Sequence, residues 1–122
     1  MSAGAGPRPP LPALEALLAE AAPRHRRTLL VLDGVYSMDG DVAPLPELVA
    51  SARRHGAMVL LDDAHGMAAL GKQGRGVAEV LGVEDQIDVV VGTLGKALGS
   101  FGAFVAGSHA LRELLVNAAR SF

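Results

Sequence analysis

Polar side chains that could bind or transform a small molecule follow three predicted β-strands. Ser37 follows the first strand, Asp62 and His65 follow the second, and Thr93 and Lys96 follow the third. In open α/β sheets, ligands bind beyond the carboxyl ends of the strands. The sequence therefore predicts that a carboxylate pair, a histidine, a serine, a threonine and a lysine meet at one edge of a sheet.

Lys96 has the most distinctive setting of these residues. It lies in the apolar segment GTLGKALGS, with glycines at positions 92, 95 and 99. Removing a lysine from water lowers its pKa and makes its amine a good partner for a carbonyl group. The glycines would let a flat cofactor approach the backbone. An exposed lysine in a turn is the alternative interpretation.

Two aspartates, Asp62 and Asp63, follow the apolar run VLL directly. A carboxylate that faces a pyridine nitrogen would raise the pKa of that nitrogen by about 1–3 units, which favours the protonated, electron-accepting form. A turn or helix-capping role is the alternative for an aspartate at a strand end. A turn or capping role is likewise the alternative for Ser37 and Thr93. His65 could be a turn residue or could donate to a cofactor oxygen.

Two rival motifs overlap these residues. Asp62, Asp63 and His65 could bind a metal ion, but no further ligand is evident, so we predict no metal site. The segment GMAALGKQ, residues 66–73, nearly matches a phosphate-binding loop. However, Gln73 stands where a serine or threonine must hold magnesium, and further glycines follow where a helix should begin.

The elements that must position these residues alternate along the chain. Helices are predicted from their apolar spacing and capping residues, and strands from continuous apolar runs. The predicted helices are 12–22, 46–55, 76–81 and 108–120, and the predicted strands are 28–32, 57–61, 87–91 and 101–106. Alternating strands and helices indicate a parallel sheet in an α/β fold. The last connection is too short for a crossover helix, so the fourth strand should run antiparallel or pair elsewhere.

Composition limits the class of protein. The chain has 122 residues, of which 50% are hydrophobic, a formal net charge of −2 and no cysteine. We therefore expect no nucleic-acid or membrane partner, no disulfide and no thiolate site. No signal peptide or membrane-spanning segment is visible, which predicts a cytoplasmic protein. Residues 1–11 are expected to form a flexible tail, and residues 12–122 a single domain that is only partly present.

Three motifs in order give the chain a family resemblance. They are DGVYSMDGDVAPLPELV, VLLDDAHGMAALGKQGRG and VVGTLGKALGSFGAFVAGS, within residues 28–122. Together they resemble the α-oxoamine synthases, a family of pyridoxal-phosphate (PLP) enzymes. The resemblance implies the fold type I large domain, a mostly parallel sheet flanked by helices with one antiparallel strand.

The resemblance also implies roles for individual residues. Lys96 matches the lysine that forms the Schiff base with PLP and later removes the Cα proton of the amino acid. Asp62 matches the aspartate paired with the pyridine nitrogen. His65 and Ser37 match residues near the phenolic oxygen of PLP, and Thr93 matches a residue close to the lysine and the cofactor phosphate.

The implied reaction condenses an amino acid with an acyl thioester of coenzyme A or an acyl carrier protein, and carbon dioxide is lost. The sequences DDAHG and GRG favour the branch that uses L-alanine to make 8-amino-7-oxononanoate for biotin. The branches of glycine C-acetyltransferase, 5-aminolevulinate synthase and serine palmitoyltransferase are the alternatives. The family forms its active sites between two subunits, which implies a homodimer.

Parts of the family pattern have no counterpart in the chain. These are the glycine-rich phosphate turn, the aromatic residue that stacks on the cofactor ring, and the C-terminal domain with its substrate-binding arginine. We therefore expect the chain to be a fragment of such an enzyme. A non-catalytic remnant is the alternative from another functional class.

Overall fold

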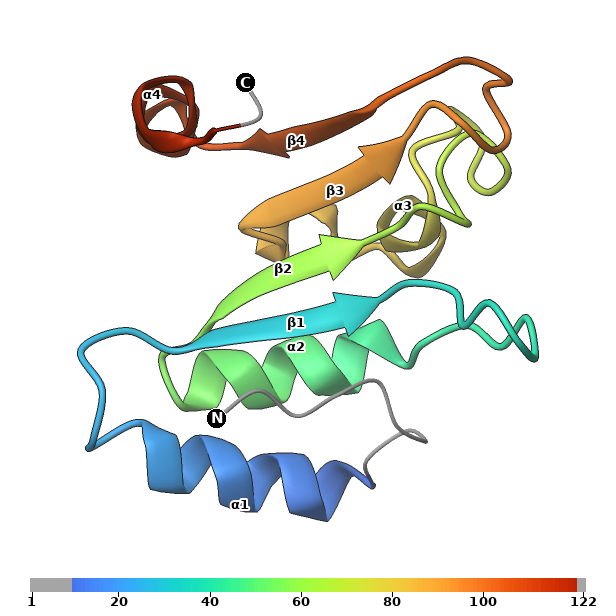
Figure 1. Cartoon of the computed structure of the whole chain (residues 1–122). Coiled ribbons are helices and arrows are strands. Elements are labelled where there is room, and N and C mark those ends of the chain that lie inside the picture. Colours follow the sequence, from blue (N-terminus) through green and yellow to red (C-terminus); the bar gives the residue numbers. More distant parts are fainter. Residues whose placement is uncertain (1–9, 121–122) are drawn as a thin grey trace.

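A computed structural model describes residues 10–120 as a four-stranded sheet with helices packed against it (Figure 1). The elements follow one another as α1 (Leu11–Ala21), β1 (Leu29–Asp33), α2 (Leu45–Arg54), β2 (Met58–Asp62), α3 (Val77–Leu81), η1 (Glu84–Gln86), β3 (Val89–Thr93), β4 (Ala103–Gly107) and α4 (His109–Ala118). The predicted α/β fold is confirmed. Residues 1–9 of the predicted tail lie outside the described residues, and Leu11 already belongs to α1.

The sheet has the mixed topology expected from the sequence. β1, β2 and β3 are parallel neighbours in that order, and β4 pairs with β3 in the antiparallel direction. Only residues 94–102 connect β3 to β4, so the chain turns back instead of crossing over. In the register, Asp33 lies beside Asp62 and Asp62 beside Val91. β1 and β2 therefore end at the same level of the sheet, and β3 extends two residues further in the same direction.

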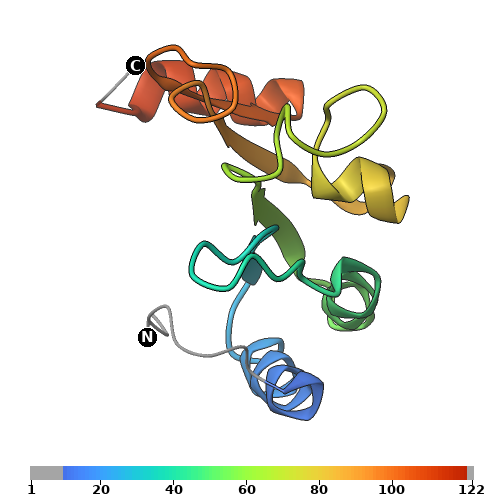
Figure 2. The same cartoon turned by 90° about the vertical axis from the view of Figure 1, so that its right-hand side faces the viewer.

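One face of the sheet carries the hydrophobic core. Val59 and Leu61 of β2 point to this face and are fully buried. α2 and α3 cover the face, and α1 packs along α2 (Figures 1 and 2). The alternation of β2 thus turns its odd-numbered residues inward and leaves Leu60 and Asp62 on the opposite face.

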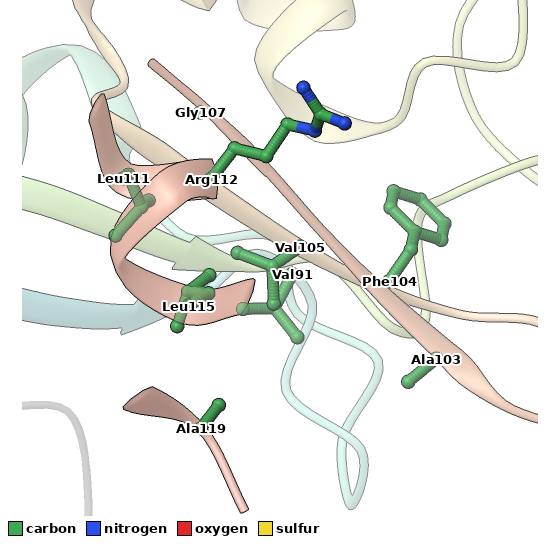
Figure 3. Close-up of a pocket in the computed structure, with 9 residues that line it drawn as sticks. All are labelled: Val91, Ala103, Phe104, Val105, Gly107, Leu111, Arg112, Leu115 and Ala119. Carbon is green, nitrogen blue, oxygen red and sulfur yellow. The ribbon is translucent and has the colours of Figure 1, made fainter. Parts of the chain in front are cut away.

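The opposite face is covered only in part. α4 lies on this side, beyond β3 and β4 (Figure 2). Leu111 and Leu115 of α4 line one groove with Val91 and Val105 of the sheet (Figure 3). The exposed apolar side chains on the rest of this face are Leu29, Val31 and Met58. None of the helices within residues 10–120 is long and apolar enough to cross a membrane.

β3 continues two residues beyond its predicted end at Val91. Gly92 and Thr93 still pair with β4, opposite Phe104 and Ala103. The ring of Phe104 occupies the space beside Gly92, where an added Cβ atom would overlap it. A glycine argues against a strand in a sequence pattern, but here it admits an aromatic ring. The short helix η1 was not predicted.

Candidate active site

The predicted site residues are distributed along one edge of the sheet, beyond the carboxyl ends of β1, β2 and β3 (Figure 1). Ser37 lies in the β1–α2 loop. Asp62 is the last residue of β2, and His65 follows it in the next loop. Thr93 is the last residue of β3, and Lys96 lies in the β3–β4 loop.

Lys96 and His65 are in direct contact. The Nζ atom of Lys96 lies 2.9 Å from Nε2 of His65, although 31 residues separate them in the chain. Both side chains are exposed. The contact joins the loop after β2 to the loop after β3, so it depends on the parallel pairing of these strands. The structure thus brings the predicted lysine and histidine together.

Hydrogen bonds shape the loop that carries Lys96. The hydroxyl of Thr93 accepts the Gly95 N–H at 3.2 Å and donates to the Gly102 carbonyl at 3.3 Å. The Ser100 N–H donates to the Leu94 carbonyl at 2.7 Å. Thr93 therefore joins the start and the end of the loop, and it holds the backbone on both sides of the lysine.

Asp62 presents its carboxylate at the partly covered face of the sheet. Its side chain is half-buried, and Oδ1 accepts the Ala64 N–H at 3.1 Å. On this face its register partners are Asp33 of β1 and Val91 of β3. One lone pair of Oδ1 is used within the turn, and the rest of the carboxylate can accept from a bound molecule.

Asp63 points away from this face and into the protein. Its side chain is 1% exposed, and Oδ2 accepts the Val77 N–H at 2.7 Å. Burial raises the pKa of Asp63, and the N–H groups of Val77 and Gly66 lower it in part. A carboxylate pair was expected at the edge of the sheet, but Asp63 of this pair points into the interior. The burial of Asp63 was predictable from the sequence, because side chains alternate along a strand and Asp63 continues the series of the buried residues Val59 and Leu61.

Ser37 belongs to the β1–α2 loop, whereas His65 and Lys96 belong to the loops after β2 and β3. It is exposed near the tip of the β1–α2 loop, which is closed by a hydrogen bond from the Tyr36 N–H to the Asp41 carbonyl at 2.9 Å. Within residues 10–120, no direct hydrogen bond joins Ser37 to Lys96 or His65. Ser37 therefore lies at the same edge of the sheet as Lys96 and His65 but forms no hydrogen bond with either of them.

Parts of both rival motifs, Asp63 and the segment that resembles a phosphate-binding loop, make hydrogen bonds within the protein. Asp62 and Asp63 diverge, and within the described part of the chain no three His, Asp or Glu side chains cluster closely enough to hold a metal ion. In the segment that resembles a phosphate-binding loop, the Gln73 N–H donates to Glu79 at 2.9 Å, as does the neighbouring Arg75 N–H. A side-chain carboxylate therefore already occupies the N–H groups that would hold a phosphate.

The remaining arrangement fits an aldehyde cofactor that carries a pyridine ring. The exposed Lys96 amine is accessible to an aldehyde, and the adjacent His65 ring can exchange a proton with it. The Asp62 carboxylate lies at the same edge, on a face of the sheet that other segments leave partly open.

The family comparison covers nearly the whole chain. Residues 9–122 match the family described as aminotransferase class I and II. An 8-amino-7-oxononanoate synthase from Pelobacter propionicus is 65% identical over 96 residues, which cover 79% of this chain and 25% of that protein. One from Geobacter sulfurreducens is 59% identical over 113 residues, which cover 90% of this chain and 28% of that protein.

Solved structures share the fold. A serine palmitoyltransferase from S. paucimobilis with a bound PLP–myriocin aldimine has a TM-score of 0.84 and 48% identity, covering 91% of this chain and 28% of that one. An 8-amino-7-oxononanoate synthase from Francisella tularensis has a TM-score of 0.67 and 28% identity, covering 85% of this chain and 31% of that one. The chain thus spans 25–31% of the length of these four proteins.

Proposed function

The chain belongs to the aminotransferase class I and II family, and on this premise we propose that it is the lysine-bearing segment of a PLP-dependent acyltransferase. The complete enzyme would condense L-alanine with an acyl thioester of coenzyme A or an acyl carrier protein, release carbon dioxide and form 8-amino-7-oxononanoate. The contact between Lys96 and His65, at the edge that also carries Asp62, is the observation that carries this proposal.

Five side chains would bind PLP or position the lysine that binds it. Lys96 supplies the amine that binds its aldehyde, and Asp62 supplies a carboxylate for its pyridine nitrogen. His65 and Ser37 supply hydrogen-bonding groups for its phenolic oxygen, while Thr93 holds the lysine loop in shape. When bound, PLP supplies an electron sink for the negative charge that develops at Cα of the amino acid.

Lys96 and His65 would share the handling of protons. A contact of 2.9 Å between two nitrogens needs one donor and one acceptor, so one of them must present a lone pair. When Nε2 of His65 donates, the Lys96 amine is neutral, which is the form that attacks a carbonyl group. The same amine can accept the Cα proton of the amino acid. In the other tautomer of His65, Nε2 carries a lone pair, accepts the hydrogen bond from Nζ and can receive a proton from it.

A second candidate keeps this chemistry and changes the amino acid to serine. The similarity to serine palmitoyltransferase, at 48% identity, supports it. Two curated relatives named for 8-amino-7-oxononanoate are more similar, at 65% and 59% identity, whereas the solved synthase from Francisella tularensis is 28% identical. The two higher identities favour L-alanine over serine.

The complete enzyme is proposed to be cytoplasmic. It is also proposed to be a homodimer that serves biotin synthesis, as the resemblance to α-oxoamine synthases implies. A non-catalytic remnant of such an enzyme is the alternative. Presentation of a reactive Lys96 by the 122-residue chain would separate these alternatives.

Addition of PLP, borohydride reduction and peptide mapping provide the test. Lys72 and Lys96 are the two lysines of the chain, so Lys72→Ala is a matched control for Lys96→Ala. We expect a visible absorption band and a label on Lys96, both lost in Lys96→Ala and retained in Lys72→Ala. The absence of a band, or equal labelling of the two lysines, would contradict the proposal for this chain.

A further inference from the structure

Asp63 carries a buried carboxylate to which the proposed function gives no role. Its side chain is 1% exposed, and Oδ1 has no hydrogen-bond partner within residues 10–120. An unpaired buried carboxylate oxygen lowers stability, because it loses its contacts with water without replacing them. The fold nevertheless holds this side chain in the interior, directly beside the site.

Three glycines provide the space for this carboxylate. A Cβ atom added at Gly34 would lie 2.5 Å from Oδ1, and Cβ atoms added at Gly66 or Gly76 would come closer still to the carboxylate. Gly34 belongs to the loop after β1, Gly66 to the loop after β2, and Gly76 to the turn before α3. The Asp63 carboxylate therefore lies where three separate segments meet, and none of them can carry a side chain there.

Hydrogen bonds tie Asp63 to the surrounding backbone. Oδ2 accepts the N–H of Val77, the first residue of α3, at 2.7 Å. The backbone carbonyl of Asp63 accepts the N–H groups of Gly66 at 3.2 Å and Met67 at 2.9 Å. Its own N–H donates to the Val91 carbonyl of β3 at 2.9 Å. Asp63 thus connects the middle of β3, the turn after β2 and the start of α3.

We infer that Asp63 is a positioning residue: its carboxylate fixes the turn after β2 to the start of α3 and thereby holds Asp62 and His65 at the site. Asp62 directly precedes it, and His65, two residues later, contacts Lys96. The inference rests on the proposed function, which gives His65 and Lys96 their task. It can nevertheless fail separately, because the placement of the His65 ring can be measured without PLP.

The first test is Asp63→Asn in the 122-residue chain, which changes an oxygen to an amide group at nearly constant size. Glu79→Gln is the matched control, because Glu79 binds the Gln73 and Arg75 N–H groups farther along the same loop. We expect the NMR resonances of the His65 ring to shift in Asp63→Asn and to stay at the parent's positions in Glu79→Gln. A folded Asp63→Asn chain with the parent's His65 resonances would overturn the inference.

The second readout is the ratio of borohydride-trapped PLP on Lys96 to that on Lys72. Loss of a supporting hydrogen bond should lower this ratio in Asp63→Asn by about threefold to tenfold, with no change in Glu79→Gln. An unchanged ratio in Asp63→Asn would count against the inference. Failure of the parent chain to label Lys96 would instead contradict the proposed function and leave the NMR result to decide the role of Asp63.

If the Asp63→Asn variant does not fold, a second measurement on a chain that keeps the Asp63 carboxylate takes its place. Asp62→Asn removes the neighbouring charge, and acidification then protonates Asp63 in place. The inference requires the amides of Val77 and of Gly66, in the turn that carries His65, to shift with one common midpoint, because the carboxylate links α3 to this turn. A Gly66 amide that responds independently of Val77 would overturn it.

Discussion

Asp62 and Asp63 are consecutive in the chain, yet their carboxylates lie in opposite surroundings. Asp62 ends β2 on the face that it shares with its register partner Val91, whereas Asp63 is 1% exposed and accepts the Val77 N–H. Successive residues of an extended segment point to opposite sides. One aspartate of the pair therefore faces the site, and the other faces the interior.

Asp62→Asn should separate binding of the cofactor from turnover. The amide cannot supply the negative charge proposed to keep the pyridine nitrogen protonated, so turnover in the complete enzyme should fall by about 10- to 1,000-fold, one factor of ten for each pKa unit lost. Trapping of PLP on Lys96 should be partly retained. The measurements are product formation and borohydride labelling, and turnover close to the parent's would exclude the assigned role.

His65→Ala tests the contact with Lys96. Without the ring, Nζ loses its partner at 2.9 Å, and the rate of PLP trapping on Lys96 should fall by about two- to tenfold. His109→Ala is the control, because His109 is an exposed residue of α4 and its side chain is 79% exposed. The growth of the visible band with time gives both rates. Equal rates in the two variants would show that the contact does not assist the lysine.

Local patterns were sufficient to predict the elements that form the edge of the sheet. The apolar run before Asp62 predicted a buried strand. The short connection to β4 predicted that this strand runs antiparallel or pairs elsewhere, and it runs antiparallel to β3. The last helix was predicted to begin at residue 108, and Ser108 caps it, since its hydroxyl accepts the Leu111 N–H at 3.2 Å. These features depend on residues close together in the chain, so the sequence pattern contains them.

Contacts between segments that are distant in the chain were harder to predict from the sequence. The sequence placed Lys96 and His65 at one edge, but their distance depends on the register of β2 and β3, which no local pattern specifies. Ser37 was expected to join them, yet the loop that carries it leaves it exposed and not bonded to either residue. The burial of Asp63 follows the alternation of inward and outward side chains along β2. Predicting it requires this alternation to continue one residue beyond the end of the strand.

Gly92→Ala should destabilise the junction between β3 and the lysine loop. The added Cβ would overlap the ring of Phe104, and overpacking of this kind costs about 1–3 kcal/mol of unfolding free energy. Gly95→Ala is the control, because its added Cβ would have no neighbour nearer than 3.6 Å. Urea unfolding measures both. Combining Gly92→Ala with Phe104→Leu should recover part of the lost unfolding free energy, since the two positions are in contact. Additive effects of the two substitutions would show that the Phe104 ring does not occupy this space.

Glu15 joins α1 to the end of α2. Its Oε2 lies 2.8 Å from Nε2 of His55, and its Oε1 pairs with Arg54. Hydrogen bonding by His55 is the largest of several effects, the bond from Arg54 among them, that lower the pKa of Glu15 from 4.5 to about 2. A carboxylate with a lowered pKa in the folded state stabilises that state fully above its unfolded pKa and loses this effect as the pH falls through its folded pKa.

The melting temperatures of the parent and Glu15→Gln should therefore differ most at about pH 6 and converge as the pH falls from 4.5 to about 2. Thermal unfolding followed by circular dichroism gives this difference at each pH. Glu20→Gln is the control, because Glu20 forms an exposed pair with Arg24 within α1 and the turn that follows it, and such pairs contribute little. A difference for Glu15→Gln that stays constant between pH 6 and pH 2 would show that the stabilisation by Glu15 comes from packing of its side chain and not from its charge.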